Sequence, residues 1–472
     1  MKPKTWHKHH RWFGLLLGPF VILFCISGIV LNHRRQWASA DISRAWLPSA
    51  YRYENYNNGL ARGALDMPDS SVLVYGNAGI FRIYGDMAED FNAGFPAGTD
   101  FRNIRRVVAG PDSALYAAAR FGLYRLDENS RWQPEDIDPS EQITDLAVNG
   151  DSMLLLTRSE AFLSLGGDPW VKITLPDPAG RPKRSLFRTI FHIHSGEVLG
   201  LPGKIVVDIL GLALIVLCIS GYIIPLRKKL RGRGRGLVRV SSAWHRRIGL
   251  WSVFILMFLV VTGMMLRPPL LIAIAQLKID QPADNTWHDA LRAARFDPVR
   301  GDWLLSTSDG FYSLRTDFSK IEKTAAQPPV SVMGINAFEY DTDADEWIIG
   351  SFSGLYRWNR ATGIVTDYYT GVIAPEKTGA PFGLAPIAGW FRGPVQYYSG
   401  AESTDAPPMP ATLADGPMSL YNLALEVHTG RIFTLLGAAT AFYIFLAGTL
   451  TFYLLLTGHR LLPRSRKNKT IK

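Results

Sequence analysis

Residues 9–31 read HHRWFGLLLGPFVILFCISGIVL, in which two histidines and an arginine precede a long run of apolar residues. The same arrangement returns at residues 245–266, which begin HRRIGL and continue into a second uncharged run. A helix rises ~1.5 Å per residue, so ~20 apolar residues cross the hydrocarbon core of a bilayer. Both runs are therefore expected to be transmembrane helices with a histidine at the entrance.

The chain contains four apolar runs of this length. They are Trp12–Leu31, Ile205–Leu226, Ile248–Leu266 and Ile432–Leu456. The first could instead be a signal peptide cleaved near Ala38-Ser39-Ala40. That alternative is disfavoured because the first run matches the third, which lies too far from the N-terminus to be a signal. We expect an α-helical membrane bundle of four transmembrane helices.

The positive charge is concentrated in three short segments. Residues 1–11, 227–247 and 458–472 hold 19 of the 51 basic residues and no acidic residue, which leaves 32 basic against 41 acidic residues elsewhere. This is the positive-inside pattern of a membrane protein and not the basic surface of a nucleic-acid-binding protein. It predicts that both termini lie in the cytoplasm. The resulting segments are 1–33 (N-terminus and helix one), 34–185 (external), 186–267 (helices two and three with a basic loop), 268–420 (external) and 421–472 (helix four and basic tail).

The membrane part contains an internal duplication. HRxxGL occurs at 10–15 and 245–250, and a Ser-Gly or Thr-Gly pair follows at 27–28 and 262–263. HSGxVL at 194–199 matches HTGxIF at 428–433. The second helix carries extra residues near 200–203, where glycine and proline should bend or interrupt it. We expect two related hairpins, each with a histidine at the inner mouth of its first helix and another at the outer mouth of its second.

Facing histidines on separate helices suit haem iron, which takes axial imidazole ligands from facing helices of a bundle. The duplication predicts two bis-histidine haem b groups, an inner one on His10 and His245 and an outer one on His194 and His428. His33, at the outer end of the first helix, is a rival for the outer site. The alternative for each single histidine is an anchor at the lipid headgroups.

Other residues near these histidines are expected to contact the cofactor. Gly14 and Gly249 lie four residues after their histidines, on the same helix face, and leave room for a flat macrocycle. Arginines nearby could pair with the haem propionates. These are Arg11, Arg246 and Arg431.

These motifs resemble the PepSY-associated transmembrane family, which includes inner-membrane ferric-siderophore reductases. The resemblance rests on HHRWFG and ISG in the first helix, IHSGEVLG and ISG in the second, WHRRIG and VTG in the third, and VHTG before the fourth. It implies a multi-pass protein of the bacterial inner membrane with its large segments in the periplasm. It also implies a di-haem oxidoreductase that reduces a periplasmic ferric siderophore or related iron complex, with His10, His194, His245 and His428 as ligands.

The external segments depart from the small α/β PepSY domains of that family. A twelve-residue pair of alternating apolar strands recurs at 72–83, 115–126, 154–165, 303–314 and 347–358. Strand pairs around a glycine-containing turn at a period of ~40–45 residues are typical of β-propeller blades. Because neither segment holds enough blades to close a ring, we expect one all-β external domain, a single β-propeller built jointly by both segments. Two separate β-sandwiches are the alternative.

No cytoplasmic segment is long enough for a flavin or nicotinamide domain, and no G-x-G-x-x-G follows a strand. Electrons would therefore come from a membrane quinol or a redox partner, and a ferric complex would accept them. The alternative function is a membrane-anchored binding or accessory protein of an uptake system, without redox turnover.

Overall fold

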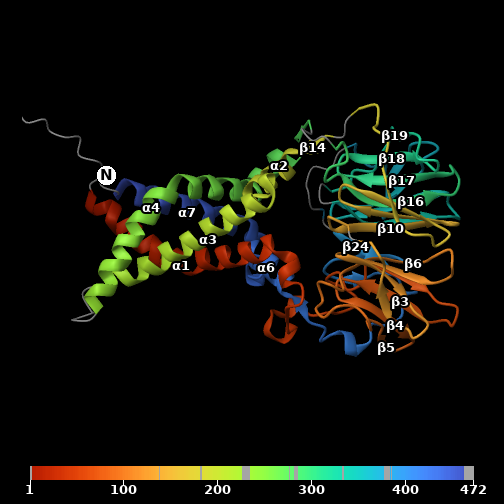
Figure 1. The fold of residues 1–472 in the computed structure, drawn as a ribbon, viewed down its shortest axis with the longest axis horizontal. Coiled ribbons are helices and arrows are strands. Elements are labelled where there is room, and N and C mark those ends of the chain that lie inside the picture. Colours follow the sequence, from red (N-terminus) through yellow and green to blue (C-terminus); the bar gives the residue numbers. More distant parts are fainter. Residues whose placement is uncertain are drawn as a thin grey trace, which may run out of the picture. The chain divides into compact units, whose positions relative to one another are not determined.

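The computed structural model describes residues 3–461 apart from 138, 181–182, 226–233, 276, 281–284, 332–333, 377–382 and 384. The chain divides into two compact units, and each draws on separated parts of the sequence. Residues 1–34, 186–277 and 421–472 form the helical unit, whereas residues 35–185 and 278–420 form the β unit. The chain therefore passes from one unit to the other four times (Figure 1).

The helical unit is built from seven α-helices in the part of the chain that the structure describes. They are α1 (Pro3–Asn32), α2 (Leu186–Ser195), α3 (Gly200–Ile223), α4 (Gly234–Met265), α5 (Leu270–Ala275), α6 (Leu420–His428) and α7 (Thr440–Leu461). Within the described residues, four stretches are long and apolar enough to cross a membrane: Lys4–Asn32, Glu197–Ile223, Gly236–Met265 and Phe442–Leu461. The several apolar membrane helices expected from the sequence are present.

The four long helices pack in a closed order. Helix α1 contacts α3 and α7, and α4 contacts the same two helices. Helices α1 and α4, which carry the matching HRxxGL motifs, therefore lie on opposite corners of the bundle. The short helices α2 and α6 precede α3 and α7 and carry the second pair of matching motifs.

Glycines determine where two of the helices begin. The second helix is interrupted next to the expected position, since Gly196 and Gly200 have φ values of +79° and +61°, and α3 then runs through Pro202 in its first turn, where proline is tolerated. The fourth span begins at Phe442 and not at Ile432, because Gly430 and Gly437 have φ values of +74° and +48° that a helix cannot continue through. A glycine in the left-handed region therefore follows each short helix, Gly196 after α2 and Gly430 after α6.

The β unit consists of antiparallel strands. The strands are β1 (Asp41–Ile42), β2 (Gly63–Asp66), β3 (Val72–Gly76), β4 (Gly79–Tyr84), β5 (Met87–Asp90), β6 (Ile104–Ala109), β7 (Leu115–Ala119), β8 (Gly122–Leu126), β9 (Trp132–Pro134), β10 (Ile143–Asn149), β11 (Ser152–Thr157), β12 (Ala161–Leu165), β13 (Val171–Ile173), β14 (Arg184–Ser185), β15 (Lys278–Ile279), β16 (Leu291–Asp297), β17 (Asp302–Thr307), β18 (Gly310–Arg315), β19 (Ile321–Lys323), β20 (Ile335–Asp341), β21 (Glu346–Ser351), β22 (Gly354–Trp358), β23 (Val365–Asp367), β24 (Ile387–Trp390), β25 (Pro394–Gln396), β26 (Gly400–Ala401) and β27 (Met418–Ser419). Five sheets are four-stranded meanders (β2–β5, β6–β9, β10–β13, β16–β19 and β20–β23), and β24–β26 form a three-stranded one. The pairs β1–β27 and β14–β15 complete the unit.

The five strand pairs that recur in the sequence are confirmed. Each forms the second and third strands of a four-stranded sheet, as in β3–β4, where Val72 pairs with Ile83. The sixth sheet was not apparent from the repeat, because its strands are only four, three and two residues long and contain glycine and proline.

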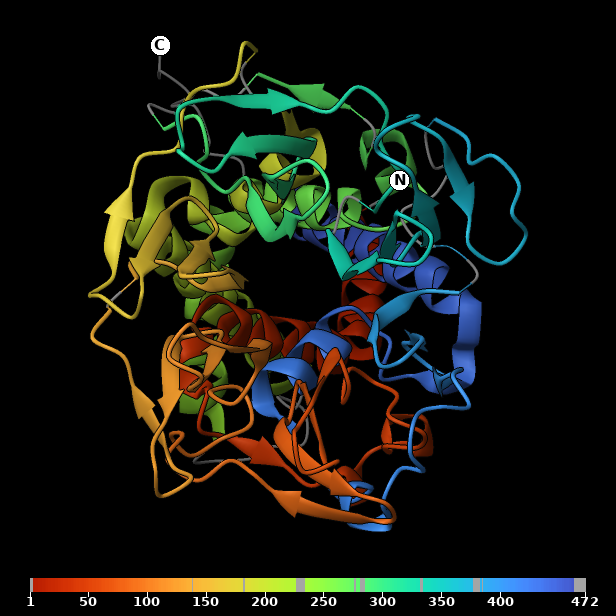
Figure 2. The same ribbon diagram turned by 90° about the vertical axis from the view of Figure 1, so that its right-hand side faces the viewer.

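The first strands of the six sheets contact one another in sequence order. Strand β2 contacts β6, and the contacts continue through β10, β16, β20 and β24 and back to β2. The sheets accordingly follow one another around a ring (Figure 2). Apolar side chains fill the space between neighbouring sheets, as where Leu154 and Leu156 of β11 pack with Leu305 of β17.

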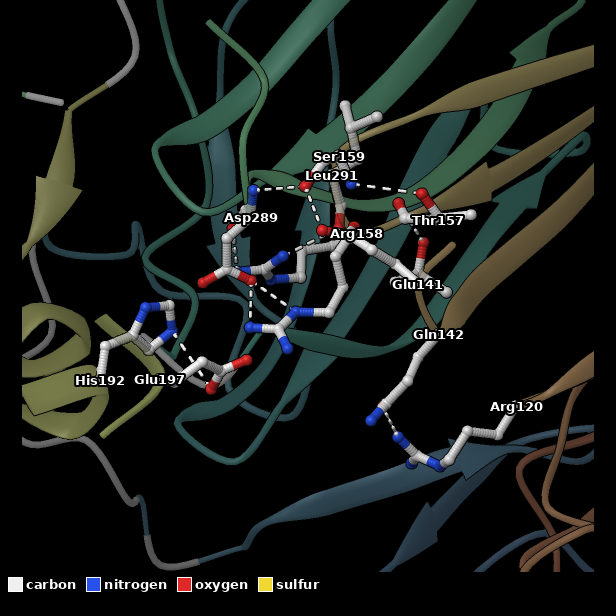
Figure 3. A network of polar contacts seen from close by, with 12 residues as sticks. Arg120, Glu141, Gln142, Thr157, Arg158, Ser159, His192, Glu197, Asp289 and Leu291 are labelled. Carbon is white, nitrogen blue, oxygen red and sulfur yellow. Dashed lines mark hydrogen bonds and ion pairs between the residues drawn. The ribbon is translucent and has the colours of Figure 1, made fainter. Parts of the chain in front are cut away.

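Buried ion pairs join the two external segments inside this unit. Arg158, which follows β11, donates from Nε to Oδ1 of Asp289 at 2.5 Å, and the Ser159 hydroxyl accepts a hydrogen bond from the Asp289 amide at 2.8 Å (Figure 3). Asp145 of β10 likewise pairs with Arg295 of β16 at 2.5 Å. The third and fourth sheets, which come from different segments, are therefore joined by charge as well as by apolar packing.

Candidate functional site

The structure brings His10 and His245 together across the bundle. His10 lies on α1 and His245 on α4, and the centroids of their rings are 6.0 Å apart. Two imidazoles that bind one metal ion from opposite sides place their centroids roughly 6 Å apart, because each metal–nitrogen bond is roughly 2 Å long. The spacing of this inner pair therefore suits a shared metal.

A second pair is formed by His194 and His428, whose ring centroids are 6.3 Å apart. Each histidine lies in the last turn of a short helix, α2 or α6. Two residues after each histidine comes a glycine in the left-handed region, Gly196 or Gly430, just beyond the end of the helix. Glycine there is a common way to end a helix, so the conserved spacing of His-Ser-Gly and His-Thr-Gly within the chain places each imidazole at a chain reversal.

Each of the four histidines is held through Nδ1. The Nδ1 atom of His10 lies 3.2 Å from the Leu454 carbonyl, that of His194 lies 3.1 Å from the Leu259 carbonyl, and that of His428 lies 3.0 Å from the Phe24 carbonyl. Because a carbonyl oxygen only accepts, these three Nδ1 atoms carry the proton. The Nδ1 of His245 lies 2.8 Å from the Ser220 hydroxyl, which itself donates to a carbonyl and so accepts from the imidazole.

This arrangement leaves Nε2 of each neutral imidazole with a lone pair. Metal-binding histidines are commonly oriented in this way by a hydrogen bond to the other ring nitrogen. The hydroxyl partners repeat the design, since each histidine meets a serine or threonine of a neighbouring long helix. They are Thr457 for His10 (3.0 Å), Ser220 for His245 (2.8 Å), Thr262 for His194 (3.1 Å) and Ser27 for His428 (3.0 Å).

A glycine follows each of these hydroxyl residues and makes room for the imidazole. A methyl group added at Gly263 would lie 2.9 Å from His194, and one at Gly28 would lie 3.2 Å from His428. The corresponding distances are 3.0 Å between Gly458 and His10 and 3.8 Å between Gly221 and His245. The Ser-Gly and Thr-Gly pairs noted in the sequence therefore contact histidines of other helices, the hydroxyl through a hydrogen bond and the glycine through close approach to the ring.

The donor set fits a metal carried by a planar macrocycle. No group of three or more histidine, cysteine, aspartate or glutamate side chains that could hold a metal ion occurs among the described residues. A structural zinc site needs four protein ligands, whereas haem supplies four equatorial nitrogens and needs only axial ligands from the protein. Two neutral imidazoles with free Nε2 atoms meet that requirement.

The structure places the rival His33 elsewhere. Its Nε2 atom lies 2.5 Å from Oδ2 of Asp208 on α3, and Asn32 donates to the other oxygen of the same carboxylate at 3.1 Å. Asp208, the unusual charge within the second apolar run, is thus bound by the end of α1. His33 and Asp208 therefore form a polar contact between the end of α1 and α3. In the outer pair, the ring of His428 lies next to the rings of His194 and Phe24 and not next to His33.

The remaining predicted residues are spread around the two pairs. A methyl group at Gly14 would first meet Leu454 at 3.7 Å, and one at Gly249 would first meet Leu217 at 3.8 Å. Arg11 lies over the Trp12 ring and Arg246 is exposed. Arg431 donates to both oxygens of the buried Glu426 carboxylate. Their proposed contacts with a cofactor remain predictions.

Two features of the sites were missed in the sequence. Thr457-Gly458, near the end of α7, is the counterpart of Ser220-Gly221 in α3. Arg267, just after α4, lies near Arg431, Glu426 and His428. The sequence signal for Thr457-Gly458 was its position near the end of the fourth apolar run.

A comparison with known families agrees with the duplicated motifs. The model of the PepSY-associated TM region matches residues 6–462. The chain belongs to this family. The match extends across both external segments, so the family assignment predicted from the helical motifs is confirmed for nearly the whole chain.

Other comparisons are remote. No curated protein matches this chain. Among solved structures, the extracellular domain of a hybrid two-component system from B. thetaiotaomicron is 11% identical with a TM-score of 0.36, and the match covers 68% of this chain and 30% of that one. Virginiamycin B lyase from Staphylococcus aureus is 7% identical with a TM-score of 0.33, and the match covers 67% of this chain and 72% of the lyase. The chain thus spans about a third of the first of these proteins.

Proposed function

We propose that this protein is a di-haem b electron carrier of the bacterial inner membrane. The proposal is carried by one observation: two pairs of imidazoles, with ring centroids 6.0 and 6.3 Å apart, each hydrogen-bonded through Nδ1. His10 and His245 would hold the inner haem, and His194 and His428 the outer one. A haem with both axial positions filled supplies one-electron transfer.

The protein's own residues would fix the chemistry of the two sites. The hydrogen bonds on Nδ1 orient each ring and make it a better donor through Nε2. Near the outer pair, Arg267 and Arg431 offer positive charge for the propionates of the macrocycle. At the inner pair, Arg11 and Arg246 are the candidates for that role.

The electron donor would be a membrane quinol or a redox partner, since no G-x-G-x-x-G motif for a nicotinamide or flavin nucleotide follows a strand in the sequence. The acceptor would be a periplasmic ferric siderophore or a related iron complex, so the protein would act as an oxidoreductase. This part of the proposal rests on the family resemblance. We also propose that the six sheets of the β unit form one propeller in the periplasm, supported by the closed order of strand contacts from β2 to β24.

An absorption spectrum of the purified protein tests the central claim. Reduction with dithionite should give the paired α and β bands of low-spin haem b, and quantitation should give two haems per chain. His10→Ala should lower the ratio to one and leave the outer haem, and His428→Ala should do the converse. A colourless protein from haem-replete cells would overturn the proposal.

His33→Ala is the matched control, because His33 pairs with Asp208 and not with another histidine. It should retain two haems per chain. Reoxidation of the reduced protein by ferric chelates, followed at the α band, then tests the acceptor separately from the cofactor.

A further inference from the structure

The β unit contains a cavity at the centre of its ring of sheets. Its volume is about 70 Å³, which is room for several water molecules or one small oxyanion. The lining comes from β6, β10, β16 and β20 and from the chain just before β2, so five of the six sheets contribute. The first strands of these sheets therefore surround one small space.

A repeated irregularity directs side chains into this space. The pairing register of the first strand shifts at the same position in five sheets, between Ile104 and Arg106 in β6 and at the matching place in β10, β16, β20 and β24. A β-bulge of this kind re-aims a side chain. The bulged residues of the first four of these strands, Arg105, Thr144, Arg292 and Asn336, all line the cavity.

The lining has an excess of positive charge. Five arginines contribute to it, whereas only two carboxylates do, so three positive charges are in excess. The arginines are Arg62, Arg105, Arg106, Arg292 and Arg295. Like charges gathered in a partly desolvated space cost free energy unless an anion balances them.

The two carboxylates are engaged with two of the arginines. Glu339 accepts from Arg106 at 2.8 Å and Asp145 accepts from Arg295 at 2.5 Å. Burial raises the pKa of Glu339, but Arg106 and Arg295 outweigh it and hold that pKa below its ordinary value, so the carboxylate is ionised at neutral pH.

Two of the other arginines, Arg62 and Arg292, also hydrogen-bond to neutral groups. Arg62 donates to the side chain of Asn103 at 2.8 Å and to the Ile104 carbonyl at 2.9 Å. Arg292 donates to the Leu291 and Asp289 carbonyls and lies 3.9 Å from the Asp289 carboxylate, which already pairs with Arg158.

We propose that this cavity binds the carboxylate or phosphate group of a small periplasmic solute, held by the guanidinium groups of Arg105 and Arg292. Guanidinium forks match both groups in bidentate geometry. Thr144 and Asn336 add a hydroxyl and an amide to the lining. The site does not depend on haem, so its test is independent of the redox proposal.

Isothermal titration calorimetry of the full-length protein in non-ionic detergent tests the site, with inorganic phosphate and citrate as separate probes and chloride as a control at constant ionic strength. At least one probe should bind with one site per chain, and whichever binds identifies the group. Arg105→Gln should weaken that binding by about tenfold or more, as expected for the loss of a charge-assisted pair of hydrogen bonds.

Arg125→Gln is the matched control, because Arg125 is half exposed and pairs with Asp112 at the surface. It should bind the probe as the wild type does. If Arg105→Gln does not fold, Arg292→Lys replaces it, since lysine keeps the charge and loses the fork. Binding of neither probe, or equal affinity in wild type and the folded variant, would overturn the proposal.

Discussion

The four histidine sites repeat one local design: an imidazole, a hydroxyl that bonds its Nδ1, and a glycine beside its ring. The hydroxyl fixes which nitrogen is available, and the glycine fixes how close the ring can approach the neighbouring helix. Since a methyl group at Gly263 would lie 2.9 Å from His194, side chains at these glycines act directly on the histidines.

Gly263→Val should therefore displace His194 and empty one site only. We expect the haem content to fall from two toward one per chain, with the inner haem retained, as measured by the pyridine haemochromogen spectrum. Gly236→Val is the control, because Gly236 lies on the same helix α4 and an added methyl group there would meet nothing within 4 Å. Retention of two haems in Gly263→Val would contradict the role assigned to the glycine.

Asp309 gives a residue-scale prediction for the β unit. Burial raises its pKa, but hydrogen bonds from Lys278 and Lys323 outweigh this and hold the pKa below its ordinary value. A depressed carboxylate pKa contributes stability above the unfolded-state pKa of about 4, and that stability is lost as the pH falls below it.

Asp309→Asn should lower the stability of the β unit by about 1–3 kcal/mol at pH 7, the range for hydrogen bonds to charged groups. The difference from wild type should persist down to about pH 5 and shrink below about pH 4. Thermal unfolding followed by circular dichroism at several pH values measures it. A difference that grows on acidification would contradict the assignment.

The pairing of the histidines was predictable because the duplication kept their spacing, and the bundle then placed equivalent residues opposite one another. The glycine contacts were not. Gly14 and Gly249 share a helix face with their own histidines, but the space beside an imidazole is set by the helix that it meets. Sequence spacing within one helix does not report on that neighbour.

At the scale of the elements, the two external segments depend on each other through buried charge. Asp289 is 5% exposed and pairs with Arg158 across the third and fourth sheets. Because Arg158 is 21% exposed, removal of Asp289 leaves a partly solvated charge, and the cost is about 1–3 kcal/mol, less than for a fully buried pair.

Asp289→Ala should therefore lower the unfolding free energy of the β unit by roughly that amount. Asp112→Ala is the control, since Asp112 pairs with the half-exposed Arg125 and an exposed pair contributes less than about 1 kcal/mol. Urea unfolding monitored by tryptophan fluorescence compares the two. Similar losses of unfolding free energy in both variants would show that the pair across the sheets contributes no more to stability than the exposed pair.

The elements were predictable where their pattern was long and regular. The five hairpins have strands of five or six residues, and alternation marked them well. The first strand of five of the six sheets carries a bulge that breaks the alternation, and β24–β26 are too short to show a repeat. The predicted start of the fourth span was wrong, because the backbone conformation at Gly430 and Gly437, and not hydropathy, determines where α7 begins.

At the scale of the whole molecule, the charge pattern fixes an expected orientation. Leu165 and Met87 are exposed in the β unit, and Lys4 is exposed near the N-terminus. In a variant lacking Cys25 and Cys218, cysteine at Leu165 or Met87 should react with a membrane-impermeant maleimide in intact spheroplasts. Cysteine at Lys4 should react only after the membrane is permeabilised. The reverse pattern would contradict the orientation.

The four crossings of the chain between the units have a consequence for biogenesis. A nascent polypeptide that ends at residue 277 has three of the six sheets and lacks β16, the partner of β10. The apolar faces of these sheets have no packing partner until residues 278–420 have been synthesised. The contact between β24 and β2 can therefore form only after residue 390 has been synthesised. A chain interrupted before that point exposes an apolar sheet face that proteases or chaperones can recognise.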